Sequence, residues 1–372
     1  MLEKNRKIRF LDLAAAHTEL RDEIEAAILD VSRSGTYLLG SKLATFEDEF
    51  ASYTGAKYCA GVSNGLDALK LALLSVGVSP GDEVIVPAHT FIATWLAVSQ
   101  VGAVPIPIEP EWDTMNIDSS NLQASITSKT KAILVTHLYG MPANLQSLID
   151  IARQNGIPIV EDAAQAQGAS YFKKKIGGHS DLVCWSFYPG KNLGAMGDAG
   201  GITTNSSEYD EKIRALRNYG ALKKYVHTII GFNCRMDEVQ AAILSVKLRK
   251  LDEWNSRRHY LADVYKRHLS NLPIVLPYQE DNYLSSWHLY VIRTPLRNKL
   301  YEHLIANGCD VLIHYPIAPH KQDCYKSTFI NAQFPITEKI SNEALSLPIS
   351  PHHSESDIEY VCGIIRDFFN SI

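Results

Sequence analysis

The sequence predicts an α/β protein with a large domain built on a mostly parallel central sheet and a smaller C-terminal α+β domain. Through the first half of the chain, short apolar runs alternate with segments of helical periodicity, which indicates crossover connections between parallel strands. From about Trp254 this alternation becomes irregular. The length of 372 residues suits one large and one smaller hydrophobic core. We therefore expect a large domain over residues 1–250 and a small domain over residues 251–372.

Two helices are expected before the first strand. Apolar residues recur at helical spacing over residues 20–31, and Gly35 is placed to end this helix as its C-cap. Ser41 is expected to cap a second helix, whose apolar residues over 43–53 lie on one face.

The central sheet is predicted from six apolar runs. Helices are expected between them, one capped by Asn64 and another over residues 144–155. The glycines that follow the last run predict a tight loop over residues 194–201. The six expected strands cover residues 58–62, 83–87, 103–108, 131–136, 157–162 and 182–185.

The C-terminal part gives fewer clear signals. A long helix is expected after Asp237, with apolar residues spaced as far as Leu251. Residues 287–293 predict a strand, residues 297–307 a helix, and an apolar face over residues 358–368 a final helix.

The composition excludes several classes of protein. Hydrophobic residues make up 46% of the chain and charged residues 21%, as in ordinary globular proteins, and the net charge of −5 argues against a nucleic-acid partner. No apolar run is long enough for a membrane span, and no apolar core of a signal peptide follows the charged N-terminus. The six cysteines form no CxxC pair and no zinc-type spacing. We expect a cytoplasmic protein with no metal site and no membrane partner.

Lys191 and Asp162 are the residues around which the chain is organised. Asp162 ends one expected strand, and Lys191 follows the next strand along the chain. Enzymes that use pyridoxal 5′-phosphate need this pair, because a lysine binds the cofactor's aldehyde and an acid keeps its ring nitrogen protonated. A nucleotide-binding phosphate loop is excluded, because Trp185 and Asn192 occupy positions where that motif needs Gly and Ser or Thr.

Ser63, Asn64 and Gly65 lie where a strand turns into a helix. Free backbone N–H groups at a helix start bind anions, so this turn is a candidate site for the cofactor's phosphate. Taken alone, this segment is explained better by an ordinary capped helix.

The segment SFYPGKNLGAMGDAGG, residues 186–201, resembles the lysine segment of the DegT/DnrJ/EryC1/StrS family of sugar aminotransferases. The resemblance runs from about residue 8 to the C-terminal helix. It implies the fold of the pyridoxal-phosphate-dependent aspartate aminotransferases (fold type I). The ending GDAG resembles the branch that aminates 3-keto sugars on a nucleotide diphosphate.

Further cofactor-binding residues are implied by this resemblance. EDAAQAQG matches a family segment that assigns Asp162, rather than the adjacent Glu161, to the ring nitrogen. The resemblance also implies that an aromatic ring stacks on the cofactor, that an amide lies near its phenolic oxygen, that a hydroxyl binds its phosphate, and that an amide reaches the phosphate of the neighbouring subunit. These residues are, in that order, Phe91, Gln165, Ser186 and Asn233.

The resemblance implies a substrate pocket and an assembly as well. His314, Tyr315 and His320 belong to a HYPxxxH segment that lines the sugar-nucleotide pocket in the family, and Tyr188 flanks the lysine. Because Asn233 would act in the neighbouring subunit, a homodimer with shared active sites is expected.

The expected reaction moves the amino group of L-glutamate to C3 of a dTDP-3-keto-6-deoxyhexose. It yields 2-oxoglutarate and a dTDP-3-amino-3,6-dideoxyhexose, with pyridoxamine 5′-phosphate as the form of the cofactor between two half-reactions. Lys191 would move the proton and Asp162 would keep the ring electron-withdrawing in both. Two alternatives stay open: a 4-keto nucleotide-sugar aminotransferase of the same fold, and a non-catalytic regulator that binds pyridoxal phosphate or a nucleotide sugar.

Overall fold

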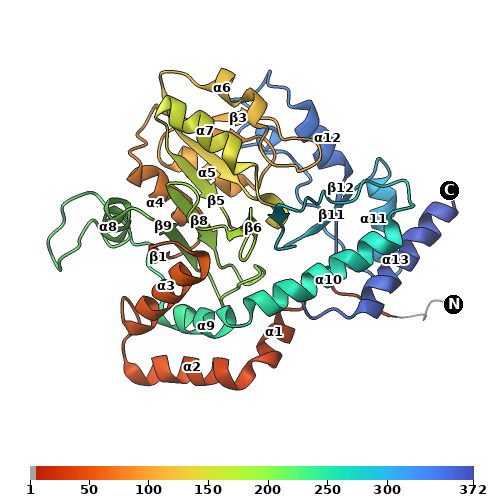
Figure 1. Cartoon of the computed structure of the whole chain (residues 1–372), viewed down its shortest axis with the longest axis horizontal. Helices are drawn as coiled ribbons and strands as arrows, with labels where there is room; N and C mark the ends of the chain where they lie inside the picture. The colour runs from red at the N-terminus through yellow and green to blue at the C-terminus, as the bar shows by residue number, and fades with distance from the viewer. Residues whose placement is uncertain (1–5) are drawn as a thin grey trace.

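A computed structural model describes residues 6–372, and its largest feature is a seven-stranded sheet (Figure 1). The strand order is β1-β9-β8-β5-β4-β2-β3, and β8, β5, β4, β2 and β3 are parallel to one another. Only β9 runs antiparallel, to both β1 and β8. The predicted α/β class is confirmed. The strands are β1 (Tyr58–Val62), β2 (Glu83–Pro87), β3 (Val104–Ile108), β4 (Thr130–Thr136), β5 (Ile159–Asp162), β8 (Leu182–Ser186) and β9 (Gly200–Thr204).

The last of these strands was missed by sequence reasoning, which predicted a tight loop up to Gly201. Gly200 lies close to the turn before the helix that follows β1. A Cβ atom there would lie 2.4 Å from the carbonyl oxygen of Asn64 and 2.9 Å from that of Trp185. Glycine is needed here because β9 packs closely against the backbone at Asn64 and Trp185. It does not mark a turn at this position.

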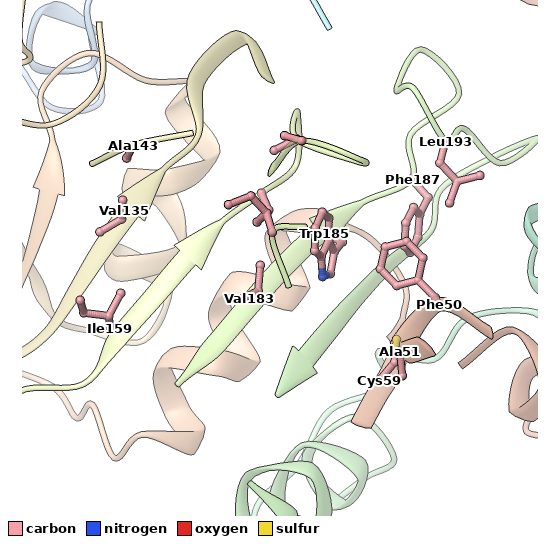
Figure 2. Close-up of a cluster of buried hydrophobic side chains, with 14 of the residues drawn as sticks. Phe50, Ala51, Cys59, Val135, Ala143, Ile159, Val183, Trp185, Phe187 and Leu193 are labelled. Carbon is pink, nitrogen blue, oxygen red and sulfur yellow. The ribbon is translucent and has the colours of Figure 1, made fainter. Parts of the chain in front are cut away.

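Helices cover both faces of the sheet. Alternate side chains of each strand enter one of two hydrophobic clusters, as the pleat requires. In one cluster, Trp185 and Phe187 meet the ring of Phe50 edge-on, each with ring centroids 5.1 Å apart (Figure 2). The helices on this face are α3 (Ser41–Thr54), α7 (Leu145–Asn155) and α9 (Glu238–Leu248), and those on the other are α4 (Gly65–Ser75), α5 (Ile92–Gln100) and α8 (Ser207–Leu216).

The N-terminal helices are α1 (Leu13–Glu19) and α2 (Arg21–Ser34), and Gly35 ends α2 in the left-handed conformation, as predicted. The predicted cap of α3 is wrong, because Ser41 is already helical and Gly40 holds the N-cap position. The carboxylate of Glu238 takes the capping role. It accepts hydrogen bonds from the N–H groups of Gly40, Lys42 and Leu43 over 2.7, 2.9 and 3.2 Å.

The C-terminal part packs around a third hydrophobic cluster. One long helix was expected after Asp237, but α9 ends at Leu248 and α10 begins at Leu251. The expected strand from Trp287 begins only at Tyr290, since Trp287 has a positive φ of 47°. The division at residue 250 stays a prediction. The elements of this part are α10 (Leu251–Leu269), β11 (Tyr290–Arg293), α11 (Arg297–Ala306), α12 (Pro335–Glu343), β12 (Ala344–Leu347) and α13 (Glu355–Asn370).

Short elements complete the described chain. Within residues 6–372, no helix combines the length and the apolar character that crossing a membrane requires. The short elements are α6 (Leu122–Ser125), β6 (Ser170–Tyr171), β7 (Lys174–Lys175), β10 (Tyr283–Leu284) and the 3-10 helices η1 (Ser119–Asn121), η2 (Leu138–Gly140) and η3 (Pro319–Lys321).

Candidate active site

A cavity of about 880 Å³ opens where the parallel strands end. Thr136, Asp162 and Ser186, the last residues of β4, β5 and β8, all line it. Ligands of parallel sheets bind at this edge, because the carboxyl ends of the strands meet there. Lys191 lies on the loop after β8 and lines the same cavity.

Asp162 and Glu161 face opposite sides of β5, as neighbouring strand residues must. Asp162 faces the cavity, where its Oδ2 accepts a hydrogen bond from the hydroxyl of Thr94 at 2.9 Å. Burial raises the pKa of Asp162, although the bond from Thr94 opposes this rise. Glu161 lies away from the cavity and is bonded to His137 at 2.7 Å and to Ser180 at 2.6 Å. Glu161 therefore links β5 to the segments that carry His137 and Ser180. From this strand, Asp162 alone presents a carboxylate to the cavity.

Lys191 presents an amine with an unusual acidity. Burial lowers its pKa from 10.5 to about 8, and the negative charge of Asp162 only partly opposes the change. A far larger share of the amine is neutral near pH 7.5 than for an ordinary lysine. The side chain is thus suited to act as a nucleophile and as a base.

The start of α4 forms an anion cradle beside Ser186. Asn64 is the N-cap, and its side chain accepts the N–H of Asp67 at 2.8 Å, as the sequence predicted. A Cβ on Gly65 would lie 2.7 Å from the Cβ of Ser186, which is too close. Only glycine at this position lets the start of α4 lie against Ser186. Asn64, Gly65 and Ser186 line the cavity. Ser63 does not line it, and its hydroxyl is bonded to Asp67 at 2.5 Å.

Aromatic and amide side chains form another part of the cavity lining. Phe91 is half exposed, and its ring centroid lies 5.3 Å from that of Tyr315. The amide of Gln165 donates to the Tyr315 hydroxyl at 2.9 Å. His314 and Tyr188 line the same cavity. Burial lowers the pKa of His314 to about 4, so this histidine is neutral at pH 7.

Besides Ser63, two predicted site residues lie outside the cavity of this chain. His320 is buried away from the cavity, and its ring is 3.1 Å from the carboxylate of Glu338. The HYPxxxH pattern does not bring its second histidine to the cavity, because residues 319–321 form a 3-10 turn that packs against α12. Asn233 is exposed and pairs with Asn218 in an isolated bridge, also outside the cavity.

Sequence reasoning missed several residues that line the cavity or act on it. Thr94 is hidden inside an apolar helix, and its spacing from the helix start gave no separate signal. His288 and Arg258 come from the part of the chain whose pattern was irregular. The ring of His288 is 3.1 Å from the side-chain oxygen of Asn192, next to Lys191. Only the folded chain brings these residues to the cavity or to Asp162.

Comparison with known proteins places this site in a family. The model of the DegT/DnrJ/EryC1/StrS aminotransferase family matches residues 18–366. The chain belongs to the DegT/DnrJ/EryC1/StrS aminotransferase family. It is accordingly a transaminase, and the family predicted from residues 186–201 is confirmed.

Two curated members are 48% identical to this aminotransferase. One is the erythromycin biosynthesis sensory transduction protein EryC1 of Saccharopolyspora erythraea, which aligns with 96% of this chain and 99% of its own. The other is the dTDP-3-amino-3,6-dideoxy-α-D-galactopyranose transaminase of Aneurinibacillus thermoaerophilus, aligned over 97% and 99%.

Solved structures of family members share the fold throughout. Streptomyces venezuelae DesV, in complex with a ketimine intermediate, has a TM-score of 0.96 and 46% identity, covering 98% of this chain and 99% of that one. NtdA of Bacillus subtilis, with bound cofactor pyridoxamine phosphate, has a TM-score of 0.91 and 32% identity, covering 98% and 87%. These matches confirm the predicted aminotransferase fold.

Proposed function

We propose that this aminotransferase uses pyridoxal 5′-phosphate to move the amino group of L-glutamate to C3 of a dTDP-3-keto-6-deoxyhexose. The observation that carries the proposal is the single cavity shared by Lys191, Asp162 and the start of α4. The name of the Aneurinibacillus relative, a dTDP-3-amino-3,6-dideoxyhexose transaminase, supports the sugar and the position. The pyridoxamine phosphate bound by NtdA supports the cofactor.

The residues of the cavity fit this cofactor. Gly65 lets the start of α4 lie close against Ser186, so that backbone N–H groups and a hydroxyl together would hold a phosphate. Phe91 offers an exposed ring face to a pyridine ring, and Asp162 offers a buried carboxylate to its nitrogen. When bound, the cofactor supplies an electron sink that stabilises negative charge on the carbon next to the transferred nitrogen.

The protein's own groups would then handle the protons. Lys191 Nζ, released from the cofactor, would take the proton from the α-carbon of glutamate and later deliver a proton to C3 of the sugar. Its pKa of about 8 suits both tasks near neutral pH. The neighbouring histidines His288 and His314 stay uncharged, because burial lowers the pKa of each. They line the site without adding positive charge next to the lysine.

We further propose a cytoplasmic homodimer in which Asn233 binds the cofactor phosphate of the partner subunit. The segment that follows α8 projects from the body of the molecule (Figure 1). Large apolar side chains on it are exposed, among them Tyr225 at 83% and Ile230 at 92%. Exposed apolar clusters of this kind mark protein contacts. Asn233 follows directly after this segment.

The test is a visible absorption spectrum of the protein with pyridoxal phosphate, recorded before and after L-glutamate is added. Loss of the cofactor's visible band in the wild type, and no such change in Lys191→Ala, is expected. A spectrum without a band from bound cofactor would overturn the cofactor assignment. Offering dTDP-linked 3-keto and 4-keto hexoses to the glutamate-treated protein then separates the proposed reaction from the 4-keto alternative.

The second candidate is a regulator that binds the cofactor or a nucleotide sugar without catalysis. The name of the relative EryC1, a sensory transduction protein, supports this regulatory candidate. The presence of Lys191 and Asp162 in one cavity favours the enzyme. A cofactor band that does not respond to glutamate, or to any other amino donor, is the result expected of the regulator.

A further inference from the structure

Arg258 is a buried cation that no acid among residues 6–372 neutralises. It lies on α10 with 4% of its surface exposed. Its Nη1 donates to the carbonyl oxygens of Trp287 and Ile349, over 3.1 and 2.8 Å. Its Nε is fully enclosed and has no acceptor among residues 6–372. Burial alone lowers its pKa to about 9, and no carboxylate of the described chain acts in the other direction.

Such a group is costly for a protein. A desolvated charge without a counter-ion destabilises the folded state by several kcal/mol, and a buried donor without an acceptor adds to this cost. Proteins keep such groups where a ligand completes them. The unneutralised guanidinium therefore points to an anion that arrives from outside the chain.

The position of Arg258 narrows the choice of anion. It lines the cavity that holds Lys191 and Asp162. It also lines a second cavity of about 450 Å³, whose lining includes Lys191 and residues of the same loop. The anion would thus bind in the cavity that Lys191 lines, whose lining also includes His288.

We propose that Arg258 binds a carboxylate of the amino donor, an inference that rests on the proposed function. Nη1 is committed to two carbonyl groups and Nε is enclosed by the protein, so Nη2 is the guanidinium nitrogen that is left for a ligand. A carboxylate oxygen accepts a charge-assisted hydrogen bond from an N–H group of this kind. Glutamate carries a carboxylate on the carbon that must react next to Lys191.

A sugar diphosphate is the competing anion. It belongs to a long ligand whose nucleotide has to extend toward solvent, whereas Arg258 is almost fully enclosed. A small amino acid that enters the cavity whole suits this enclosed cation better. The two half-reactions of the enzyme separate these anions, because glutamate takes part in one and the nucleotide sugar in the other.

Arg297 provides a matched control. It is also buried, with 7% exposed, and its Nη1 likewise donates to two carbonyl oxygens, those of Ser341 and Ala344, each at 3.2 Å. Burial lowers its pKa too. It lies on α11 and does not line the cavity of Lys191. Substitution of Arg297 therefore shows the effect of losing a buried arginine that has only a structural role.

The experiment compares Arg258→Gln, Arg258→Lys and Arg297→Gln in the cofactor-loaded protein. The rate of the visible spectral change is measured against glutamate concentration, and binding of 2-oxoglutarate to the pyridoxamine form is measured by calorimetry. For Arg258→Gln we expect glutamate and 2-oxoglutarate to bind about 10- to 100-fold more weakly, as loss of a charge-assisted pair implies. The half-reaction with the nucleotide sugar changes less than about threefold, and Arg258→Lys recovers part of the loss.

Three results would overturn the inference. Arg258→Gln could bind glutamate as Arg297→Gln does, it could lose both half-reactions equally, or it could lose only the half-reaction with the sugar, which would assign Arg258 to the diphosphate. Arg258→Lys gives the same comparison if the glutamine variant does not fold. A wild-type spectrum that ignores glutamate would instead mark the failure of the proposed function, and the inference would fall with it.

Discussion

The hydroxyl of Thr94 donates a hydrogen bond to Oδ2 of Asp162 over 2.9 Å, and among residues 6–372 it is the only side chain that bonds this carboxylate. Thr94 lies on α5 and Asp162 at the end of β5, 68 residues apart in the sequence. Burial pushes the pKa of Asp162 up, and Thr94 pushes it down. This bond therefore helps to keep the carboxylate charged where the cofactor's ring nitrogen is expected.

Thr94→Val is expected to slow the glutamate half-reaction about tenfold at pH 7, because a hydrogen bond to a charged group contributes roughly 1.5–3 kcal/mol. Without the bond the pKa of Asp162 rises further, so the carboxylate is protonated at a higher pH. The acid limb of the pH–rate profile should move to higher pH. Stopped-flow absorbance measures this limb. Thr94→Ser, which keeps the hydroxyl, should leave the limb in place, and an unmoved limb in the valine variant would contradict the role of Thr94.

A second prediction concerns Lys191 and cofactor uptake. Burial lowers the pKa of this amine to about 8, and only the neutral amine attacks an aldehyde. Uptake of pyridoxal phosphate by the cofactor-free protein should accelerate as pH rises and level off above a midpoint near 8. Because the charge of Asp162 raises the pKa of Lys191, Asp162→Asn should move the midpoint to lower pH. Rapid-mixing absorbance gives both midpoints, and a wild-type midpoint near 10 would refute the lowered pKa.

Much of the fold was readable from local patterns. Apolar runs and helical spacing located the parallel strands and most of the helices, because burial imposes those periods directly on the sequence. Gly200 and Ser41 show where such reading fails. A glycine signals close packing as well as turns, and the cap of α3 comes from Glu238, which is 198 residues from Gly40. Contacts between distant residues leave no local pattern.

In the candidate site, too, some residues could be predicted from local patterns and others depend on contacts between distant parts of the chain. Asp162 and Lys191 stand at strand ends, so their meeting at one edge of the sheet could be expected from topology. Family resemblance added the residues Phe91, Gln165 and Tyr315, which do line the cavity. Arg258 and His288 could not be found this way, because α10 and the segment before β11 carry no motif and reach the cavity only through tertiary packing.

A third prediction concerns Glu238, whose carboxylate caps α3. Glu238→Ala removes the acceptor of three backbone N–H groups and should lower the free energy of unfolding by about 2–4 kcal/mol. Urea denaturation measures the change. Glu253→Ala is the control, since the ion pairs that Glu253 makes with Lys250 and Arg257 are exposed and their loss should cost at most about 1 kcal/mol. An equal decrease in the free energy of unfolding of the two variants would show that the cap stabilises the fold no more than an exposed ion pair does.

The last prediction tests the proposed dimer through Ile230. This side chain is 92% exposed in the single chain, so a charge there costs the monomer little. If the partner subunit covers it, Ile230→Glu forfeits about 1.5–3 kcal/mol of apolar burial and leaves an unpaired charge in the contact. Sedimentation should then show a dimer dissociation constant at least about a hundredfold higher than in the wild type.

Ile330 is the matched control for this experiment. It is 79% exposed and lies outside the segment that follows α8, so Ile330→Glu should leave the dimer intact. Asn233→Ala should keep the dimer but bind pyridoxal phosphate more weakly, because it would remove a phosphate ligand supplied across the contact. An Ile230→Glu protein that stays dimeric would place the contact elsewhere. Unchanged cofactor affinity in Asn233→Ala would remove this residue from the site, because the cradle at Gly65 and Ser186 would then hold the phosphate without it.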